Sequence, residues 1–255
     1  MPVLSTVGAA SLRAFGAFRP TSAAAQFIVA TGGTVYVDPS NADYKIHQFT
    51  SSSTFTITAC PVSATIQLMM VGGGGGGLYA GGGGGGYIYR PAFSVSVGSY
   101  SAVVGAGGGI QVSGGDTTFG GLTALGGGSP NNAGGSGGGG RDAVGGAGLQ
   151  PTSSSGGFGD KGANWTSFGN DGGGGGAGGA GGLPAGGAGR TADIISSGGF
   201  YFAFATGGHG NLSSTSYAIP NVVANSGNGG WGGGYNGISF GEGQAGIIRI
   251  RYKFQ

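Results

Sequence analysis

Uninterrupted glycine tracts constrain the fold of this chain more than any other feature of its sequence. They lie at residues 72–77, 81–86, 107–109, 126–128, 137–140, 172–176 and 232–234. Fixing a glycine in one conformation costs roughly 0.5–1 kcal/mol more than fixing an alanine, so an ordered tract needs many compensating backbone contacts. Isolated tracts of this kind would be flexible linkers. Here they lie a few residues apart and alternate with strand-like segments too short to be domains, which favours a packed arrangement.

One glycine-rich stretch also has a period of three. In GGAGGAGGLPAGGAGR, Ala177, Ala180 and Leu183 are three residues apart, and so are Ala185 and Ala188. Three residues per turn is the repeat of an extended polyproline II helix, which makes no hydrogen bonds within itself. Its backbone groups must find partners outside, and glycine lets neighbouring helices come close enough to supply them. We therefore predict a bundle of polyglycine II helices.

The overall composition excludes the main alternatives to a packed glycine-rich fold. Of 255 residues, 69 are glycine and only 9 are proline, whereas collagen needs about 15–20% proline. Charged residues make up 7% of the chain, and 14 Phe, 10 Tyr and 2 Trp provide apolar surface to bury. A disordered chain has the opposite balance of charge and aromatic residues. The composition predicts an ordered chain with a core.

Alternating polar and apolar residues predict β-strands between the tracts. The predicted strands are residues 54–58, 65–71, 93–97, 100–104, 118–125 and 248–254. In the last, Ile248, Ile250, Tyr252 and Phe254 share one face and Arg249, Arg251 and Lys253 the other, which predicts a buried side and a solvated side. We expect this strand to close the domain beside the early strand that contains Phe55 and Ile57. The fold class is all-β, a β-sandwich-like frame with glycine-rich excursions packed as polyglycine II helices.

The first 44 residues differ in composition from the rest. They end in the turn-rich Asp38-Pro39-Ser40-Asn41, and their first 27 residues are rich in small residues and lack acids. Arg13 and Arg19 interrupt the apolar stretch that a signal peptide would need. We predict a leader at residues 1–44 that docks onto a partner and a glycine-rich β domain at residues 45–255.

The order of the strand phrases resembles a known family. The series HQFTSSSTFTI, IQLMMVGGGGGGLYAGGGGGGYIYR, FSVSVGSYSAVVGAGGG, GGDTTFGGLTALGGG and GQAGIIRIRY is similar to the glycine-rich domain of tailed-phage fibre and tail-tip proteins, over about residues 46–255. A narrower similarity is to the polyglycine II sandwich adhesins that cap T-even-like long tail fibres. The resemblance implies a β-sandwich-like frame, location in the virion tail, and distal loops that contact a receptor.

The sequence offers little material for catalysis or for binding a cofactor. There are 8 acidic residues and 2 histidines, His47 and His209, and no nucleophile elbow or phosphate-binding loop. A lone cysteine, Cys60, excludes a disulfide framework, and scattered basic residues give no stripe for nucleic acid. No apolar run approaches a membrane span. We predict no catalytic residues, metal, cofactor, nucleic-acid binding or membrane insertion, and we expect that the protein is not an enzyme.

Aromatic and amide side chains flank the later glycine tracts. Rigid aromatic rings beside amides make good contact surfaces for protein loops or sugars at low entropic cost. The same rings could instead cover the glycine bundle, which has no side chains of its own. The candidate receptor-contact residues are Asn164, Trp165, Phe168, Tyr201, Phe202, His209, Asn211, Trp231, Tyr235 and Asn236.

Together these features predict a virion structural protein of the tail fibre or tail tip that contributes to host receptor binding. Its expected partners are other virion proteins, through residues 1–44, and a host surface glycan or outer-membrane protein; a homo-oligomer is also expected. Three alternatives stay open. They are a purely architectural cement, neck or tail-tip protein, a tail-associated glycan-degrading enzyme, and an ice-binding or wall protein.

Overall fold

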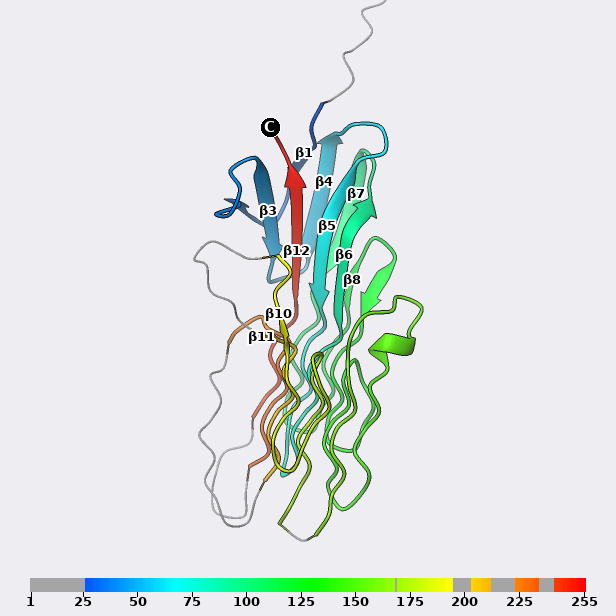
Figure 1. The fold of residues 1–255 in the computed structure, drawn as a ribbon, viewed down its shortest axis with the longest axis vertical. Helices are drawn as coiled ribbons and strands as arrows, with labels where there is room; N and C mark the ends of the chain where they lie inside the picture. The colour runs from blue at the N-terminus through cyan, green and yellow to red at the C-terminus, as the bar shows by residue number, and fades with distance from the viewer. Residues whose placement is uncertain (1–25, 168, 195–202, 212–222, 234–240) are drawn as a thin grey trace, which may run out of the picture.

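The chain forms two antiparallel five-stranded sheets that face each other, with the glycine-rich segments extending from one end of them (Figure 1). The structure is a computed structural model and describes residues 26–167, 169–194, 203–211, 223–233 and 241–255. The first sheet has the order β1 (Val29–Thr31), β4 (Ser53–Ala59), β7 (Gly98–Val103), β8 (Thr117–Phe119) and β9 (Leu122–Ala124). The second has the order β2 (Thr34–Val37), β3 (Tyr44–Phe49), β12 (Ile247–Lys253), β5 (Thr65–Val71) and β6 (Tyr87–Ser94). The other elements of the described residues are a short pair, β10 (Arg190–Thr191) and β11 (Ala203–Phe204), and a 3₁₀ turn at Gln150–Thr152.

The core lies between the two sheets. Phe55 and Ile57 of β4 and Phe119 of β8 meet Leu68 of β5 and Ile250 of β12, and all five are 0–1% exposed. Period-two alternation explains this, because every second side chain of each strand points to the same face. The predicted all-β sandwich is confirmed.

The second sheet is buried on its outer face as well. Met69, Val71 and Ile247 pack on that face against Ile194 and Phe204, which belong to the chain near β10 and β11. This second cluster joins the sandwich to the top of the glycine-rich bundle. It also explains why residues 69–71 are apolar without alternation, as expected of a strand covered on both sides.

The hydrogen bonds of the tract at residues 72–77 are those of a polyglycine II helix. Gly72 and Gly75 donate their N–H groups to Gly86 and Gly83 at 3.0 and 2.9 Å. Gly73 and Gly76 donate to a second neighbour, at residues 112–115, and Gly74 and Gly77 to a third, at residues 241–244. Residues three positions apart therefore bond to the same neighbouring segment. This is the three-residue repeat of the helix predicted from the sequence.

Six extended segments surround this tract. Besides the three acceptors of its N–H groups, three further segments donate to its carbonyl oxygens: Gly127 to Gly73, Gly108 to Gly74 and Gly230 to Gly75, at 2.8–2.9 Å. The tracts at residues 81–86 and 172–176 are likewise bonded on all sides by other extended segments. A helix enclosed in every direction has no room for a side chain at any of its three faces, which explains the uninterrupted glycine.

Segments at the surface of the bundle keep a side chain at every third position. Ala185 and Ala188 are exposed, whereas Pro184 and Gly187, one residue before each, are buried. Ala180 and Leu183 are also exposed, and Ala177 is buried against the sandwich. The period of three thus separates an outward row of side chains from inward rows of glycine backbone.

Two of the predicted strands differ from those observed. Residues 118–125 form a hairpin, because Gly120 and Gly121 have φ of +55° and +82° and make a two-residue turn between β8 and β9. The strand predicted at residues 93–97 is the end of β6, which begins at Tyr87 and includes Pro91. Proline lacks an N–H group, and its position is tolerated because β6 is an edge strand with an irregular register against β5.

The C-terminal strand is central and not an edge. β12 pairs with β3 and β5, so hydrogen-bond pairing with the strand of Phe55 and Ile57 is not observed; that strand lies in the facing sheet. The predicted inward residues do reach the core, where the Phe55 and Tyr252 rings are 6.4 Å apart. Phe254 is only partly buried against it.

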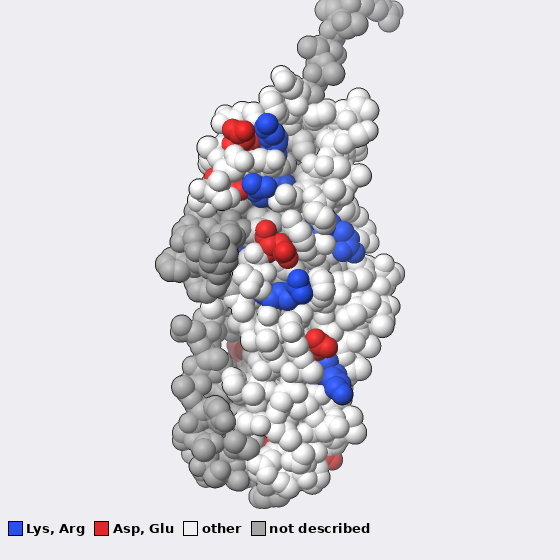
Figure 2. All heavy atoms as spheres, viewed as in Figure 1, with Lys and Arg blue, Asp and Glu red and all other residues white. Residues whose placement is uncertain are grey.

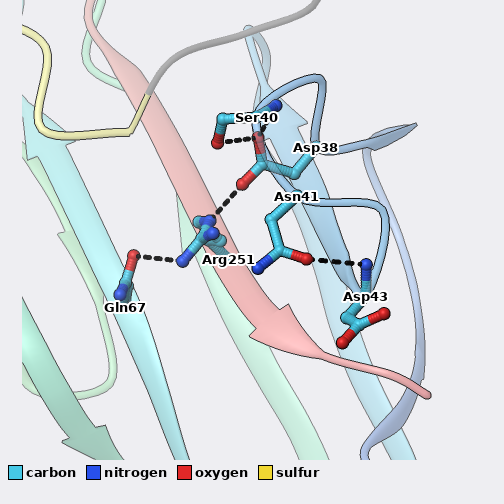
Figure 3. Close-up of polar contacts among 6 residues, drawn as sticks. All are labelled: Asp38, Ser40, Asn41, Asp43, Gln67 and Arg251. Carbon is cyan, nitrogen blue, oxygen red and sulfur yellow. Dashed lines mark hydrogen bonds and ion pairs between the residues drawn. The ribbon is translucent and has the colours of Figure 1, made fainter.

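The face of β12 predicted to be solvated is largely covered. Arg249 is 7% exposed and donates to the Ile194 carbonyl and to Gln48. Arg251 donates to the carboxylate of Asp38 and, at 3.2 Å, to Gln67, and its guanidinium lies 3.8 Å from the Tyr44 ring (Figure 3). The residues directly after β10 and the loop between β2 and β3 supply this cover. Of the three basic side chains, only Lys253 is exposed, at 52%.

The Asp38 carboxylate is held by hydrogen bonds within its own loop as well as by Arg251. The Ser40 N–H and hydroxyl donate to it at 2.8 and 2.7 Å (Figure 3). Burial would raise the pKa of Asp38, but the Ser40 hydrogen bonds and the Arg251 guanidinium outweigh it and hold the pKa below its ordinary value of 3.8. The charged form is therefore the stable one in the folded protein.

Arg251→Met is expected to reduce the free energy of unfolding at pH 7 by about 3 kcal/mol, because it leaves the buried Asp38 carboxylate without its counter-ion. A group with a lowered folded pKa contributes stability above its unfolded pKa and loses it as the pH falls through the folded value. The difference between wild type and variant should thus be complete above about pH 4 and shrink in stronger acid. Urea unfolding between pH 2.5 and pH 7 measures both effects.

Lys253→Met is the matched control, since the Lys253 and Asp43 pair is exposed on both sides at 3.8 Å. It should change stability by no more than about 0.5 kcal/mol. Equal losses for the two variants would contradict a special role for the buried pair.

The sheets begin earlier in the chain than residue 45. β1 pairs with β4, and β2 pairs with β3, although both lie within the segment predicted as a leader. Residues 1–25, where docking onto a partner was predicted, are outside the described part of the chain.

Candidate functional site

The turns at the far end of the glycine bundle form the candidate site. The helical segments run away from the sandwich and return to it, and the C-terminus lies at the sandwich end (Figure 1). The charged side chains on the face drawn in Figure 2 are more numerous toward the sandwich end than toward the far end. We call the turns at the far end the tip and define it by residues 78–80, 130–132, 141–144, 164–167, 171, 209–211 and 231–233.

The turn at residues 78–80 is central to the tip. It joins the two longest glycine tracts, and Leu78 and Ala80 exchange backbone hydrogen bonds of 3.1 and 2.6 Å. Tyr79 between them has φ of +54°, a left-handed conformation that is rare for a bulky residue. Its carbonyl accepts a 2.8 Å bond from the N–H of Asn211. The chain reversal at residues 78–80 is thus fixed by hydrogen bonds within the turn and by one from Asn211.

Arg141 lies on Tyr79. Its guanidinium carbon is 3.9 Å from the centre of the Tyr79 ring, and the backbone N–H of Arg141 donates to the side-chain oxygen of Asn131 at 2.6 Å. Arg141 follows directly after the tract at residues 137–140, so the bundle sets where the side chain begins. A guanidinium stacked on an aromatic ring is held in one plane while its edge stays available to a ligand.

Asp171 adds a buried carboxyl group beside this pair. It is 4% exposed, and its N–H donates to the Asn211 carbonyl at 3.1 Å. Burial raises the pKa of Asp171 to about 6, with a further contribution from the negative charge of Asp142 and an opposing one from Arg141. The tip therefore carries one carboxyl that changes charge in mildly acidic solution.

Asp171→Asn is expected to stabilise the protein by about 1–3 kcal/mol at pH 7.5, since one unit of pKa shift corresponds to about 1.4 kcal/mol. A raised folded pKa means that the folded state binds the proton more tightly, so the charged carboxyl destabilises the fold above about pH 6. The gain should diminish through pH 6 and vanish below about pH 4. Thermal unfolding at a series of pH values measures this; a gain that is constant with pH would contradict it.

Five of the sequence-predicted contact residues are described, and all five lie at the tip. Asn164 is exposed and its side chain accepts a 3.1 Å bond from Gly145. Trp165 is half-buried, and its N–H donates to Ala143 at 3.1 Å. The other predicted residues, Phe168, Tyr201, Phe202, Tyr235 and Asn236, are outside the described residues.

His209, Asn211 and Trp231 are joined through the tip backbone. The His209 carbonyl accepts a 2.7 Å bond from Gly232, next to Trp231. Burial lowers the pKa of His209, which keeps its ring neutral at neutral pH. The Trp231 ring lies over Gly241, where a Cβ atom would be 2.4 Å from it. Trp231 thus covers glycine backbone, as the alternative interpretation of the aromatic residues predicts.

Asn211 has an unused donor. The residue is 7% exposed, and among the described residues its buried Nδ2 atom has no hydrogen-bond partner. A buried donor left unpaired costs about 1–3 kcal/mol. The protein therefore carries an energetic cost at the tip that a suitably placed acceptor would relieve.

Sequence reasoning missed Tyr79, Arg141 and Asp171. The available signal was position, because each adjoins one of the long tracts and so must lie where an extended helix ends. In the described residues, no group of three or more histidine, cysteine, aspartate and glutamate side chains could hold a metal ion. Nor does any helix among these residues have the length and apolar character needed to cross a membrane.

A family described as a glycine-rich domain matches residues 50–253, which is most of the chain. No curated protein matches it.

Proposed function

The chain belongs to the glycine-rich domain family, and from this premise we propose that it is a structural protein of a phage tail fibre or tail tip that binds the host surface through its tip. The observation that carries the proposal is the position of the tip. A bundle bonded in every direction holds aromatic, amide and charged side chains at the end opposite the sandwich. Rigid scaffolds that present loops in this way are typical of binding proteins.

In this proposal the two ends of the molecule have separate roles. Residues 1–25, which precede β1 of the sandwich in the chain, attach the protein to other virion proteins, and the tip faces the host. The stiffness of the bundle lowers the entropic cost of binding, because the contact residues are already ordered. Self-association of the sandwich end would place several tips side by side and increase avidity.

Virions that carry Trp165→Ala are expected to adsorb to host cells at least ten-fold more slowly, because a half-buried ring at the tip is lost. The matched control is Val62→Ala, an exposed apolar residue (92%) in the loop between β4 and β5 of the sandwich, which is not part of the tip. Incorporation of each chain into virions is measured by immunoblotting. Normal adsorption with full incorporation of the Trp165 variant would leave the second candidate, a purely architectural virion protein.

The third candidate, a glycan-degrading enzyme, needs two carboxyl groups about 5–9.5 Å apart on either side of a bound sugar. Asp142 and Asp171 are near enough to influence each other, which is the observation in its favour. Release of reducing sugar ends from host polysaccharide by the purified protein, lost in Asp171→Asn, would establish the enzyme and replace the binding proposal.

A further inference from the structure

We propose that the tip recognises an uncharged glycan, with Arg141, Asp142 and Asn211 as its hydrogen-bonding groups and Tyr79 as the residue that positions Arg141. This inference rests on the proposed function and names the chemistry of the host ligand. Four observations carry it.

The first is that the donors of Arg141 are free to bind a ligand. The Arg141 side chain is 33% exposed, and the nearest carboxylate oxygen, on Asp142, is 3.9 Å from its Nε atom. That distance is too long for a hydrogen bond. Within the described part of the chain, the guanidinium therefore has a fixed plane and no close acceptor.

The second observation is the backbone of the tip turns. Tyr79, Asn131 and Asp142 all have left-handed φ values, of +54°, +67° and +53°. Glycine takes this conformation without steric cost, and asparagine and aspartate tolerate it, but tyrosine does not. Residue 79 is a strained tyrosine between two glycine tracts, where a glycine would carry no strain, which indicates that its side chain is needed there.

The third observation is the local balance of charge. A carboxylate oxygen of Asp142 lies 3.9 Å from the Arg141 Nε atom, and Asp171 is close enough for the charges of both residues to act on its pKa, so two carboxyl groups accompany one guanidinium. An anionic ligand would be repelled by this arrangement at neutral pH. Neighbouring hydroxyl groups of a sugar suit it, because each hydroxyl can accept from the guanidinium and donate to a carboxylate.

The fourth observation is the unpaired Nδ2 donor of Asn211. Its main chain is fixed by bonds to Tyr79 and Asp171, so Asn211 belongs to the same part of the tip as the Arg141 and Tyr79 pair. Relief of an unsatisfied buried donor favours a ligand rich in acceptor oxygens. Sugar hydroxyl and ring oxygens meet this need.

The test uses the purified full chain and immobilised glycans of four kinds: uncharged hexose polymers, uncharged N-acetylhexosamine polymers, polymers containing uronic acid, and phosphorylated polysaccharide. Outer-membrane protein of the host in detergent is a fifth probe. We expect binding to one or both uncharged classes, and Arg141→Lys should weaken it at least ten-fold because lysine lacks the planar pair of donors. Asp142→Ala should weaken it similarly.

Tyr79→Gly tests positioning separately from folding. It relieves the left-handed backbone, so the variant should be at least as stable as wild type, yet it should bind at least ten-fold more weakly because Arg141 loses its platform. Tyr79→Phe keeps the ring and should bind like wild type. Gln111→Gly is the matched control, since Gln111 has φ of +59° and, among the described residues, no hydrogen bond or ring contact joins it to Arg141.

The outcomes separate the two proposals. Binding only to the acidic or phosphorylated glycans, or unchanged binding by Arg141→Lys, overturns this inference. Binding to outer-membrane protein alone overturns it and leaves the proposed function in place. Binding to none of the five probes, together with normal adsorption of Trp165→Ala virions, overturns both.

Discussion

Gly174→Ala is expected to abolish stable folding, although it adds a single methyl group. A Cβ atom at residue 174 would lie 2.0 Å from the carbonyl oxygen of Gly82 and 2.8 Å from the nitrogen of Gly83. These are backbone atoms of the neighbouring tract, which is itself enclosed and cannot move aside. Gly174 also donates to Gly208 and accepts from Gly187, so a displacement would break bonds to further segments.

The expected loss exceeds about 3 kcal/mol, the upper end of ordinary overpacking, because no flexible side chain is available to absorb the clash. That is a large part of the 5–15 kcal/mol typical of a domain. Gly174→Val, with a branched side chain, should reduce the free energy of unfolding further. Circular dichroism and calorimetry of the purified variants measure the effect as loss of the cooperative transition.

Gly109→Ala is the control. A Cβ atom at this glycine would have no other atom within 4 Å, and its φ is not in the left-handed region. The substitution should therefore be neutral or stabilise by up to about 1 kcal/mol through a lower entropy of the unfolded chain. Equal effects at residues 174 and 109 would mean that the tracts are not closely packed.

The bundle could be predicted from the sequence because glycine tracts and a three-residue period have few physical solutions. The position of each helix could not. Gly72 bonds to Gly86 nearby in the chain, but Gly74 bonds to Gln244, and nothing in local sequence distinguishes the two glycines. Which glycine segments hydrogen-bond to each other depends on the whole arrangement of turns. The three-residue period therefore predicts polyglycine II helices but does not predict which helices are neighbours.

The strands show a similar division. Residues 65–71 were predicted with the correct bounds because their pattern ends at a glycine tract. Arg249 and Arg251 were predicted to be solvated because alternation distinguishes only two faces. Whether the polar face of a strand is exposed to solvent depends on the segments, distant in sequence, that pack on it. The sequence pattern alone does not distinguish a buried arginine with a partner from an exposed one.

The candidate site was only partly predictable. Trp165, His209 and Trp231 stand out as aromatic residues in a glycine-rich background, and they lie at the tip. Arg141 gives no such signal, since its significance depends on the ring of Tyr79, which is 62 positions earlier in the chain and 3.9 Å away in the fold. A contact of that kind follows from helix packing and not from local composition.

Truncation after Gly246 is expected to prevent folding altogether. It removes β12, the middle strand of the second sheet, and leaves both β3 and β5 without their partner. Ile248, Ile250 and Tyr252, each no more than 2% exposed, would be lost from the core at the same time. Losing a buried aliphatic or aromatic side chain costs about 2–5 kcal/mol, so three of them exceed the stability of an ordinary domain.

The same truncation also removes a connection between the bundle and the sandwich. The segment that bonds to Gly74 and Gly77 runs directly into β12 and would end there. The truncated chain should be insoluble or give no cooperative thermal transition. Deletion of residues 1–25 is the matched control: it removes a segment of greater length but none of the described strands, and the protein should melt as wild type does. If the chain ending at Gly246 still melts cooperatively, the second sheet does not depend on its central strand, and the sandwich must close in another way.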